Sequence, residues 1–131
     1  MGKGIEFLKE AGVYFIATSD DGQPQLRPFG SNLEYNGRFY FSMGRKKEVF
    51  KQMIANPKVS IAALKQNRDW IRIIGEAVLD EGEEVRNYLY EQSPRIKEIY
   101  KDDPSELAMF YLDNATCIVN ESGKAPEKID L

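Results

Sequence analysis

Three consecutive cations follow a glycine in the segment Gly44-Arg45-Lys46-Lys47, where an expected strand ends and an expected helix begins. The positive end of a helix dipole disfavours a cation by about 0.3–1 kcal/mol. An anion held at this turn would reverse that penalty, because backbone N–H groups and lysine side chains would converge on it. The segment therefore predicts a phosphate-binding turn that uses Lys46 and Lys47, whereas we expect Arg45 to lie on the surface.

Two residues of the preceding strands extend this candidate site. Arg27 carries a guanidinium, which suits bidentate binding of phosphate, and Pro28 beside it removes a backbone donor, as is tolerated at a sheet edge. Ser42 ends an apolar strand just before the basic turn, where its hydroxyl either satisfies local backbone or binds the same anion. The competing interpretation of these cations is a solvated surface.

Several kinds of catalytic centre are excluded by composition. The chain has no histidine and one cysteine, Cys117, so Ser–His and Cys–His nucleophile pairs, an intrachain disulfide and an ordinary zinc site are all ruled out. Cys117 lies in an apolar run and is expected to be a buried strand residue. No catalytic residue and no metal ligand can be assigned.

The 131 residues suit one domain, 1–131, with a core over about 7–119 and a polar C-terminal tail, 120–131. The formal net charge of −3 argues against nucleic-acid binding. The sequence shows neither a signal peptide nor a membrane-spanning run, so we expect a cytoplasmic protein without membrane partners.

The elements expected to position the site are mostly strands. Apolar periodicity and turn residues predict strands over 13–18, 25–35, 38–43, 58–64, 70–79 and 115–119, with hairpins at Asp21-Gly22 and Asn36-Gly37. Helices are expected over 2–11, 46–55, 82–90 and 94–100. Antiparallel hairpins with few helices predict a mainly β fold, a small split barrel with helices on its rim.

In the strand 70–79, Ile71 and Ile73 alternate with Trp70 and Arg72. We expect the isoleucines to face the core, so that Trp70 and Arg72 contact a cofactor or a partner subunit.

The chain resembles the FMN-binding split-barrel family related to pyridoxamine 5′-phosphate oxidase. The likeness rests on Arg27-Pro28, Phe41-Ser42, Lys46-Lys47 before a helix ending at Asn56-Pro57, and the run from Trp70 to Ala77. It implies a homodimer with FMN at the subunit interface. It also implies that Arg27 and the lysines bind the FMN phosphate, and that Phe41, Ser42 and Trp70 lie near the flavin.

Two departures limit what the resemblance implies about activity. The oxidases have a lysine that meets the substrate phosphate where this chain has Asn32, and their C-terminal Arg/His signature is absent. The histidine that the nitroimidazole-reductase branch uses near the flavin is also missing. The resemblance therefore favours an FMN-dependent oxidoreductase acting on another small molecule, with NADH or NADPH as donor. A flavin carrier or sensor without turnover is the alternative.

Overall fold

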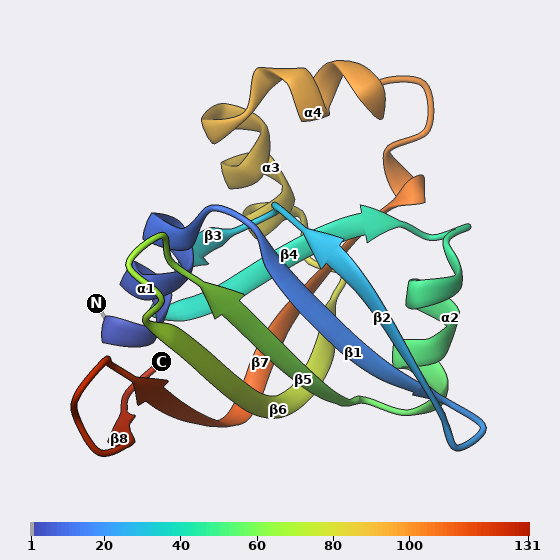
Figure 1. Cartoon of the computed structure of the whole chain (residues 1–131). Coiled ribbons are helices and arrows are strands. Elements are labelled where there is room, and N and C mark those ends of the chain that lie inside the picture. The colour runs from blue at the N-terminus through green and yellow to red at the C-terminus, as the bar shows by residue number, and fades with distance from the viewer. Residues whose placement is uncertain (1) are drawn as a thin grey trace.

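An antiparallel sheet of eight strands forms the body of the molecule (Figure 1). The computed structural model describes residues 2–131. Its elements in chain order are α1 (Lys3–Ala11), β1 (Tyr14–Asp20), β2 (Gln23–Phe29), β3 (Leu33–Tyr35), β4 (Arg38–Gly44), α2 (Glu48–Ala55), β5 (Lys58–Leu64), β6 (Trp70–Asp80), α3 (Glu83–Gln92), α4 (Pro94–Ile99), the 3-10 helix η1 (Pro104–Glu106), β7 (Leu107–Asn120) and β8 (Glu127–Ile129).

The sheet curls into a barrel that is not closed by hydrogen bonds between its two end strands. Its strand order is β2-β1-β5-β6-β7-β4-β3, with β8 pairing on β7. The two ends of this path, β2 and β3, are joined by residues 30–32 without pairing to each other. This arrangement confirms the predicted mainly β split-barrel fold. Within residues 2–131, no helix has the length and apolar character needed to cross a membrane.

Both predicted hairpins are present and have the backbone that their residues favour. Asp21 and Gly22 have φ of 50° and 86°, and Asn36 and Gly37 have φ of 52° and 72°. Positive φ at both central residues is the geometry of the type I′ turn, which matches the twist of paired strands. The registers Asp20↔Gln23 and Tyr35↔Arg38 follow directly.

Three strand predictions need correction. The strand expected over 25–35 is two strands, β2 and β3, because the chain leaves the sheet at residues 30–32. The final strand begins at Leu107 rather than residue 115, and its first half pairs with β4. The segment expected to be only a polar tail contains β8, which pairs with Cys117 and its neighbours.

Apolar side chains fill the barrel from every strand around it. Ile16, Phe39, Ile61 and Ile73 are fully buried, and α1 adds Leu8 to the same cluster. The N-terminal end of α1 meets the end of the chain, since Gly4 N–H donates to the Asp130 carbonyl at 2.8 Å and Ile5 N–H to that of Leu131 at 3.0 Å.

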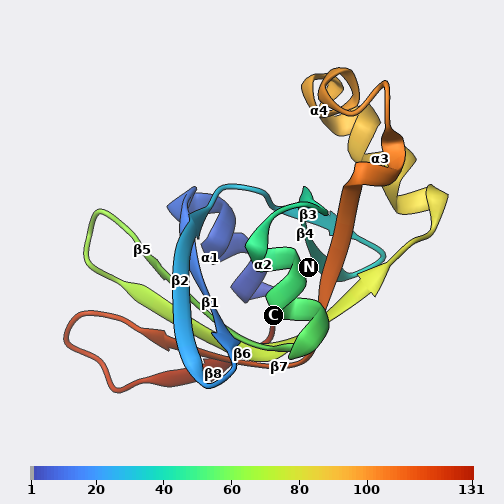
Figure 2. The same ribbon diagram turned by 90° about the vertical axis from the view of Figure 1, so that its right-hand side faces the viewer.

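The helical segment between β6 and β7 stands away from the barrel, as both views show (Figures 1 and 2). We call residues 81–106, which include α3, α4 and η1, the helical excursion. A second apolar cluster lies beneath it, in which Val85 and Leu89 of α3 pack with Tyr40 and Met109 of the sheet. Strand β4 is consequently buried on both faces.

Candidate functional site

A cavity of about 490 Å³ lies where the barrel is split. β2 provides one wall and the end of β4 the other, and the start of α2 and one residue of the excursion complete it. Its lining residues are Arg27, Pro28, Phe29, Gly30, Ser31, Ser42, Met43, Gly44, Lys47, Glu48, Val49 and Tyr100. This volume is in the range of small-molecule sites, roughly 300–1,000 Å³.

Arg27 is anchored at the cavity wall through its own hydrogen bonds. Its guanidinium donates to Thr18 Oγ1 at 2.8 Å and to Gln52 Oε1 at 2.7 Å, and more weakly to the Ile16 carbonyl. Burial lowers the pKa of Arg27 from its ordinary value, and an arginine remains charged at neutral pH. Because a guanidinium has five donors, these three bonds leave two for a ligand.

The helix expected to begin at residue 46 begins two residues later. Helix α2 begins at Glu48, and Lys47 is its N-cap residue with an extended backbone (φ −70°, ψ 146°). Lys47 lines the cavity, whereas the exposed Lys46 does not. The Lys46 N–H donates to Glu106 Oε1 at 3.0 Å, so a carboxylate of this chain already binds the turn at that point.

The two walls of the cavity are connected by a pair of serines. Ser31 lies in the break between β2 and β3, and its Oγ accepts the Ser42 N–H at 3.1 Å. The two hydroxyls are also 3.1 Å apart. Ser42 was predicted as a site residue, but Ser31 was not. No sequence signal identified Ser31, because its place opposite Ser42 depends on the path of the chain through the break.

The structure thus brings together four of the predicted residues, Arg27, Pro28, Ser42 and Lys47, from three elements. Phe41 instead has a fully buried side chain that stacks on Phe110, with ring centroids 6.0 Å apart. A cofactor contact from Phe41 would therefore have to come from its backbone.

Trp70 and Arg72 lie away from this cavity on another face of the barrel. As predicted, Ile71 and Ile73 are fully buried while Arg72 is exposed. Trp70 lines an apolar hollow of about 540 Å³ together with Phe15 and Leu64, which are 46% and 61% exposed. We call this surface of β1, β5 and β6 the apolar sheet face.

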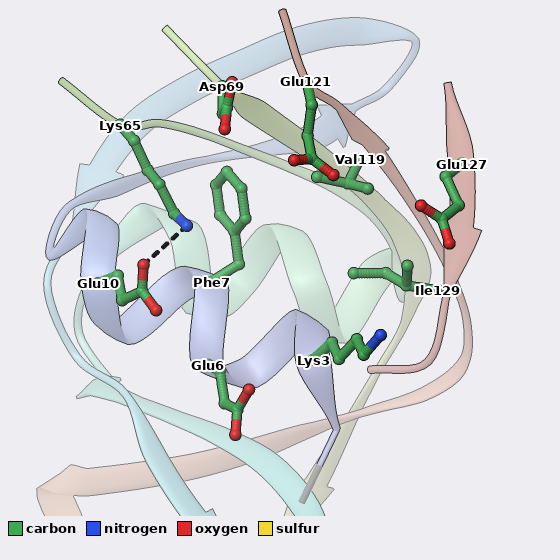
Figure 3. A pocket seen from close by; sticks show the side chains of 10 residues that line it. All are labelled: Lys3, Glu6, Phe7, Glu10, Lys65, Asp69, Val119, Glu121, Glu127 and Ile129. Atoms are coloured by element: carbon green, nitrogen blue, oxygen red, sulfur yellow. Dashed lines mark ion pairs between the residues drawn. The ribbon is translucent and has the colours of Figure 1, made fainter. Parts of the chain in front are cut away.

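A third hollow, of about 250 Å³, lies between α1, the loop from β5 to β6, the end of β7 and β8 (Figure 3). Carboxylates outnumber lysines around it, and its Lys65 pairs with Glu10 at 2.7 Å and lies over the Phe7 ring. Its lining residues are Lys3, Glu6, Phe7, Glu10, Lys65, Asp69, Val119, Glu121, Glu127 and Ile129. This charge balance is wrong for an anion, so the cavity at the split is the one suited to a phosphate. No group of three potential metal ligands occurs among residues 2–131.

Comparison with known proteins identifies the family of this chain. The family model described as pyridoxamine 5′-phosphate oxidase matches residues 4–113. A crystal structure of a NimC/NimA family protein from Clostridium acetobutylicum is 36% identical with a TM-score of 0.92, and the match covers 98% of this chain and 90% of that one. No curated protein sequence matches significantly.

More distant structures share the fold. A putative pyridoxamine 5′-phosphate oxidase from Listeria innocua is 18% identical with a TM-score of 0.66, over 98% of this chain and 94% of that one. A heme binding protein from Mycobacterium smegmatis is 16% identical with a TM-score of 0.73, over 92% and 53%. Because the family model spans most of the chain and the Clostridium protein matches nearly all of it, this protein belongs to the pyridoxamine 5′-phosphate oxidase family.

Proposed function

We propose that this protein binds FMN in the cavity at the barrel split and acts as an FMN-dependent oxidoreductase on a small molecule. The observation that carries the proposal is the convergence of Arg27, Ser42 and Lys47 on one cavity from β2, β4 and the turn before α2. Two cations and a hydroxyl suit a phosphate monoester, because charge-assisted hydrogen bonds to its oxygens are strong.

Bound FMN would supply the electron transfer, and the chain would supply binding and orientation. Arg27 and Lys47 would hold the phosphate, and the serines would fix the walls between which the ligand lies. Asn32 lies in the break beyond the cavity lining, in place of the lysine with which the oxidases bind substrate phosphate. A substrate other than pyridoxamine phosphate is therefore proposed, with NADH or NADPH as electron donor.

We further propose that the apolar sheet face is covered by a second copy of the chain. Phe15, Leu64 and Ile74 on β1, β5 and β6 are each about half exposed or more. A lone Leu or Phe on a surface is ordinary, but a contiguous apolar hollow on a sheet marks an interaction site. In the homodimer proposed here, the FMN phosphate lies in the cavity at the split, and the flavin extends from there to the subunit interface.

The visible spectrum of the purified protein and a titration of stripped protein with FMN test the binding. We expect flavin absorption, and a loss of FMN affinity of at least tenfold in Lys47→Ala and in Arg27→Ala, since each removes a charged hydrogen-bond donor. Lys58→Ala is the matched control, because Lys58 is an exposed lysine of β5 that lies outside the cavity. A haem spectrum, or no binding of FMN up to about millimolar, would overturn the proposal.

Turnover separates the oxidoreductase from the alternative, a carrier or sensor that binds flavin without reaction. Reduction of the bound flavin by NADH or NADPH, followed by its reoxidation by a small acceptor, is expected of the enzyme. Flavin that stays oxidised with both donors would favour the carrier.

A further inference from the structure

One residue of the helical excursion reaches the cavity at the split. Tyr100, directly after α4, lines the cavity opposite β2. Its hydroxyl lies 3.5 Å from the position that a Cβ on Gly44 would occupy, and Lys47 Cγ lies 3.9 Å from the same point. The Tyr100 hydroxyl is therefore close to the lysine proposed to bind phosphate, although 53 residues of sequence separate them.

The tyrosine is held in place from two sides. Its ring packs against the apolar cluster beneath the excursion, which includes Leu107 and Leu89. On its other side the hydroxyl lies against Gly44, where a Cβ would be in ordinary contact with it and in tight contact, at 3.2 Å, with Glu106 Oε1. Close approach of this kind is a recognised use of glycine.

Arg45 connects both ends of the excursion to the turn that carries Lys47. Its Nη2 pairs with Glu81 Oε1 at 2.9 Å before α3, and its Nε donates to the Ser105 carbonyl at 2.6 Å in η1. The Arg45 N–H also donates to the Glu106 carbonyl at 2.8 Å. Arg45, expected from the sequence to be a plain surface residue, thus positions the excursion over the cavity.

The chemistry of the phenol suits a phosphate ligand. Burial, together with the nearby Glu106 carboxylate, raises the pKa of Tyr100, so that it stays protonated and able to donate throughout the neutral range. A hydroxyl that donates to an ionised phosphate makes a shorter and stronger hydrogen bond than one between neutral groups. Glu106 is the competing acceptor, and its Oε1 is already bound by the Lys46 N–H.

We propose that the Tyr100 hydroxyl donates a hydrogen bond to the phosphate of FMN, and that Arg45 is the positioning residue that holds Tyr100 there. The inference rests on the proposed FMN site and adds to it a ligand from outside the barrel. The excursion would then be part of the cofactor site.

A pair of flavins tests this inference. Stripped Tyr100→Phe protein is titrated with FMN and with riboflavin, which lacks the phosphate, and binding is followed by flavin fluorescence. We expect roughly tenfold weaker binding of FMN, the effect of losing one hydrogen bond to a charged group, and unchanged binding of riboflavin. Tyr88→Phe is the control, since Tyr88 belongs to the same excursion but packs on Tyr35 outside the cavity.

Arg45→Gln gives a second, independent measurement. It should weaken FMN binding by a similar factor, and the double variant should be no weaker than either single one, because both changes remove the same contact. Unchanged FMN affinity in Tyr100→Phe would overturn the inference and leave the FMN site standing. Equal losses for FMN and riboflavin would also overturn it, since Tyr100 would then only shape the cavity. Failure of the unaltered protein to bind FMN would overturn both proposals.

Discussion

At the scale of single residues, Arg27 has two tasks at once. Its bonds to Thr18 and Gln52 join β1, β2 and α2, and the same side chain lines the cavity. A planar guanidinium can do both, whereas an ammonium is a compact point charge. The same residue therefore contributes to stability and to the proposed ligand binding.

Replacing Arg27 by lysine should separate these tasks. The charge remains, but the bridge between Thr18 and Gln52 cannot be reproduced, so we expect the free energy of unfolding to fall by about 1–2 kcal/mol. Urea denaturation measures this. Arg95→Lys, at an exposed position of α4, should change stability by less than about 0.5 kcal/mol. Equal effects of the two substitutions would contradict the structural role of Arg27.

Cys117 should be inert in the folded protein. The side chain is buried, and burial raises the pKa of its thiol to about 11. At pH 8 about one molecule in a thousand would carry the reactive thiolate. We expect negligible reaction with a thiol-labelling reagent at pH 8, and one equivalent after denaturation. Rapid labelling of the native protein would show that the segment around β8 opens readily.

Phe41 shows what residue-level reasoning from sequence could and could not predict. Alternation along a strand places Phe39 and Phe41 on one face of β4, and the opposite face is buried as well, by the helical excursion. Nothing local to β4 reveals a covering element that lies more than forty residues later. For the same reason the local sequence around Tyr100 does not reveal that this residue lines the cavity at the split.

At the scale of elements, α1 and the segment around β8 depend on each other. The Asp130 and Leu131 carbonyls satisfy two N–H groups of the first turn of α1, which a helix cannot pair internally. This approach requires a glycine, because a Cβ on Gly4 would lie 3.0 Å from Leu131 Cα and 3.3 Å from Cys117 Sγ.

Gly4→Ala is expected to destabilise the protein even though it lies in a helix. In a solvent-exposed helix, replacing glycine by alanine would raise the free energy of unfolding by about 0.5–1 kcal/mol. At Gly4, overpacking should instead lower it by about 1–3 kcal/mol. Gly30→Ala is the control, since a Cβ there meets nothing within 4 Å. Thermal unfolding compares the two variants. A higher melting temperature for Gly4→Ala would contradict this prediction, because it would mean that the C-terminal residues shift to accept the methyl group without destabilising the protein.

The sequence predicted best those elements whose conformation is favoured by their own residues. The hairpins at Asp21-Gly22 and Asn36-Gly37 were confirmed because positive φ is a property of those residues themselves. The length of β7 was not predicted, because its first half is a strand through pairing with both β4 and the end of β6, and Asn114, at φ 51°, resembles a turn residue. Asn114 instead lies where the register with β6 shifts between Ile74 and Glu76.

At the scale of the whole molecule, the apolar sheet face determines the expected assembly. Phe15→Glu places a charge in the centre of the surface that we propose a second copy covers. We expect the dimer to dissociate to a monomer, with FMN affinity falling as well because the cofactor is proposed to lie at the interface. Sedimentation velocity and an FMN titration measure the two effects. Ile54→Glu, at an exposed apolar position on α2, should leave the assembly unchanged.

The strand order also determines how this chain can reach its native state. β4 pairs with β7 and β1 with β5, and the first turn of α1 closes on the last residues, so these contacts join segments that are far apart in the sequence. Loop closure must precede most of these pairings, which places folding in the slow range of roughly milliseconds to seconds. Until β7 pairs with them, β4 and β6 each have an unpaired edge. Unpaired strand edges can pair with other chains, so the protein is prone to aggregate during this stage of folding.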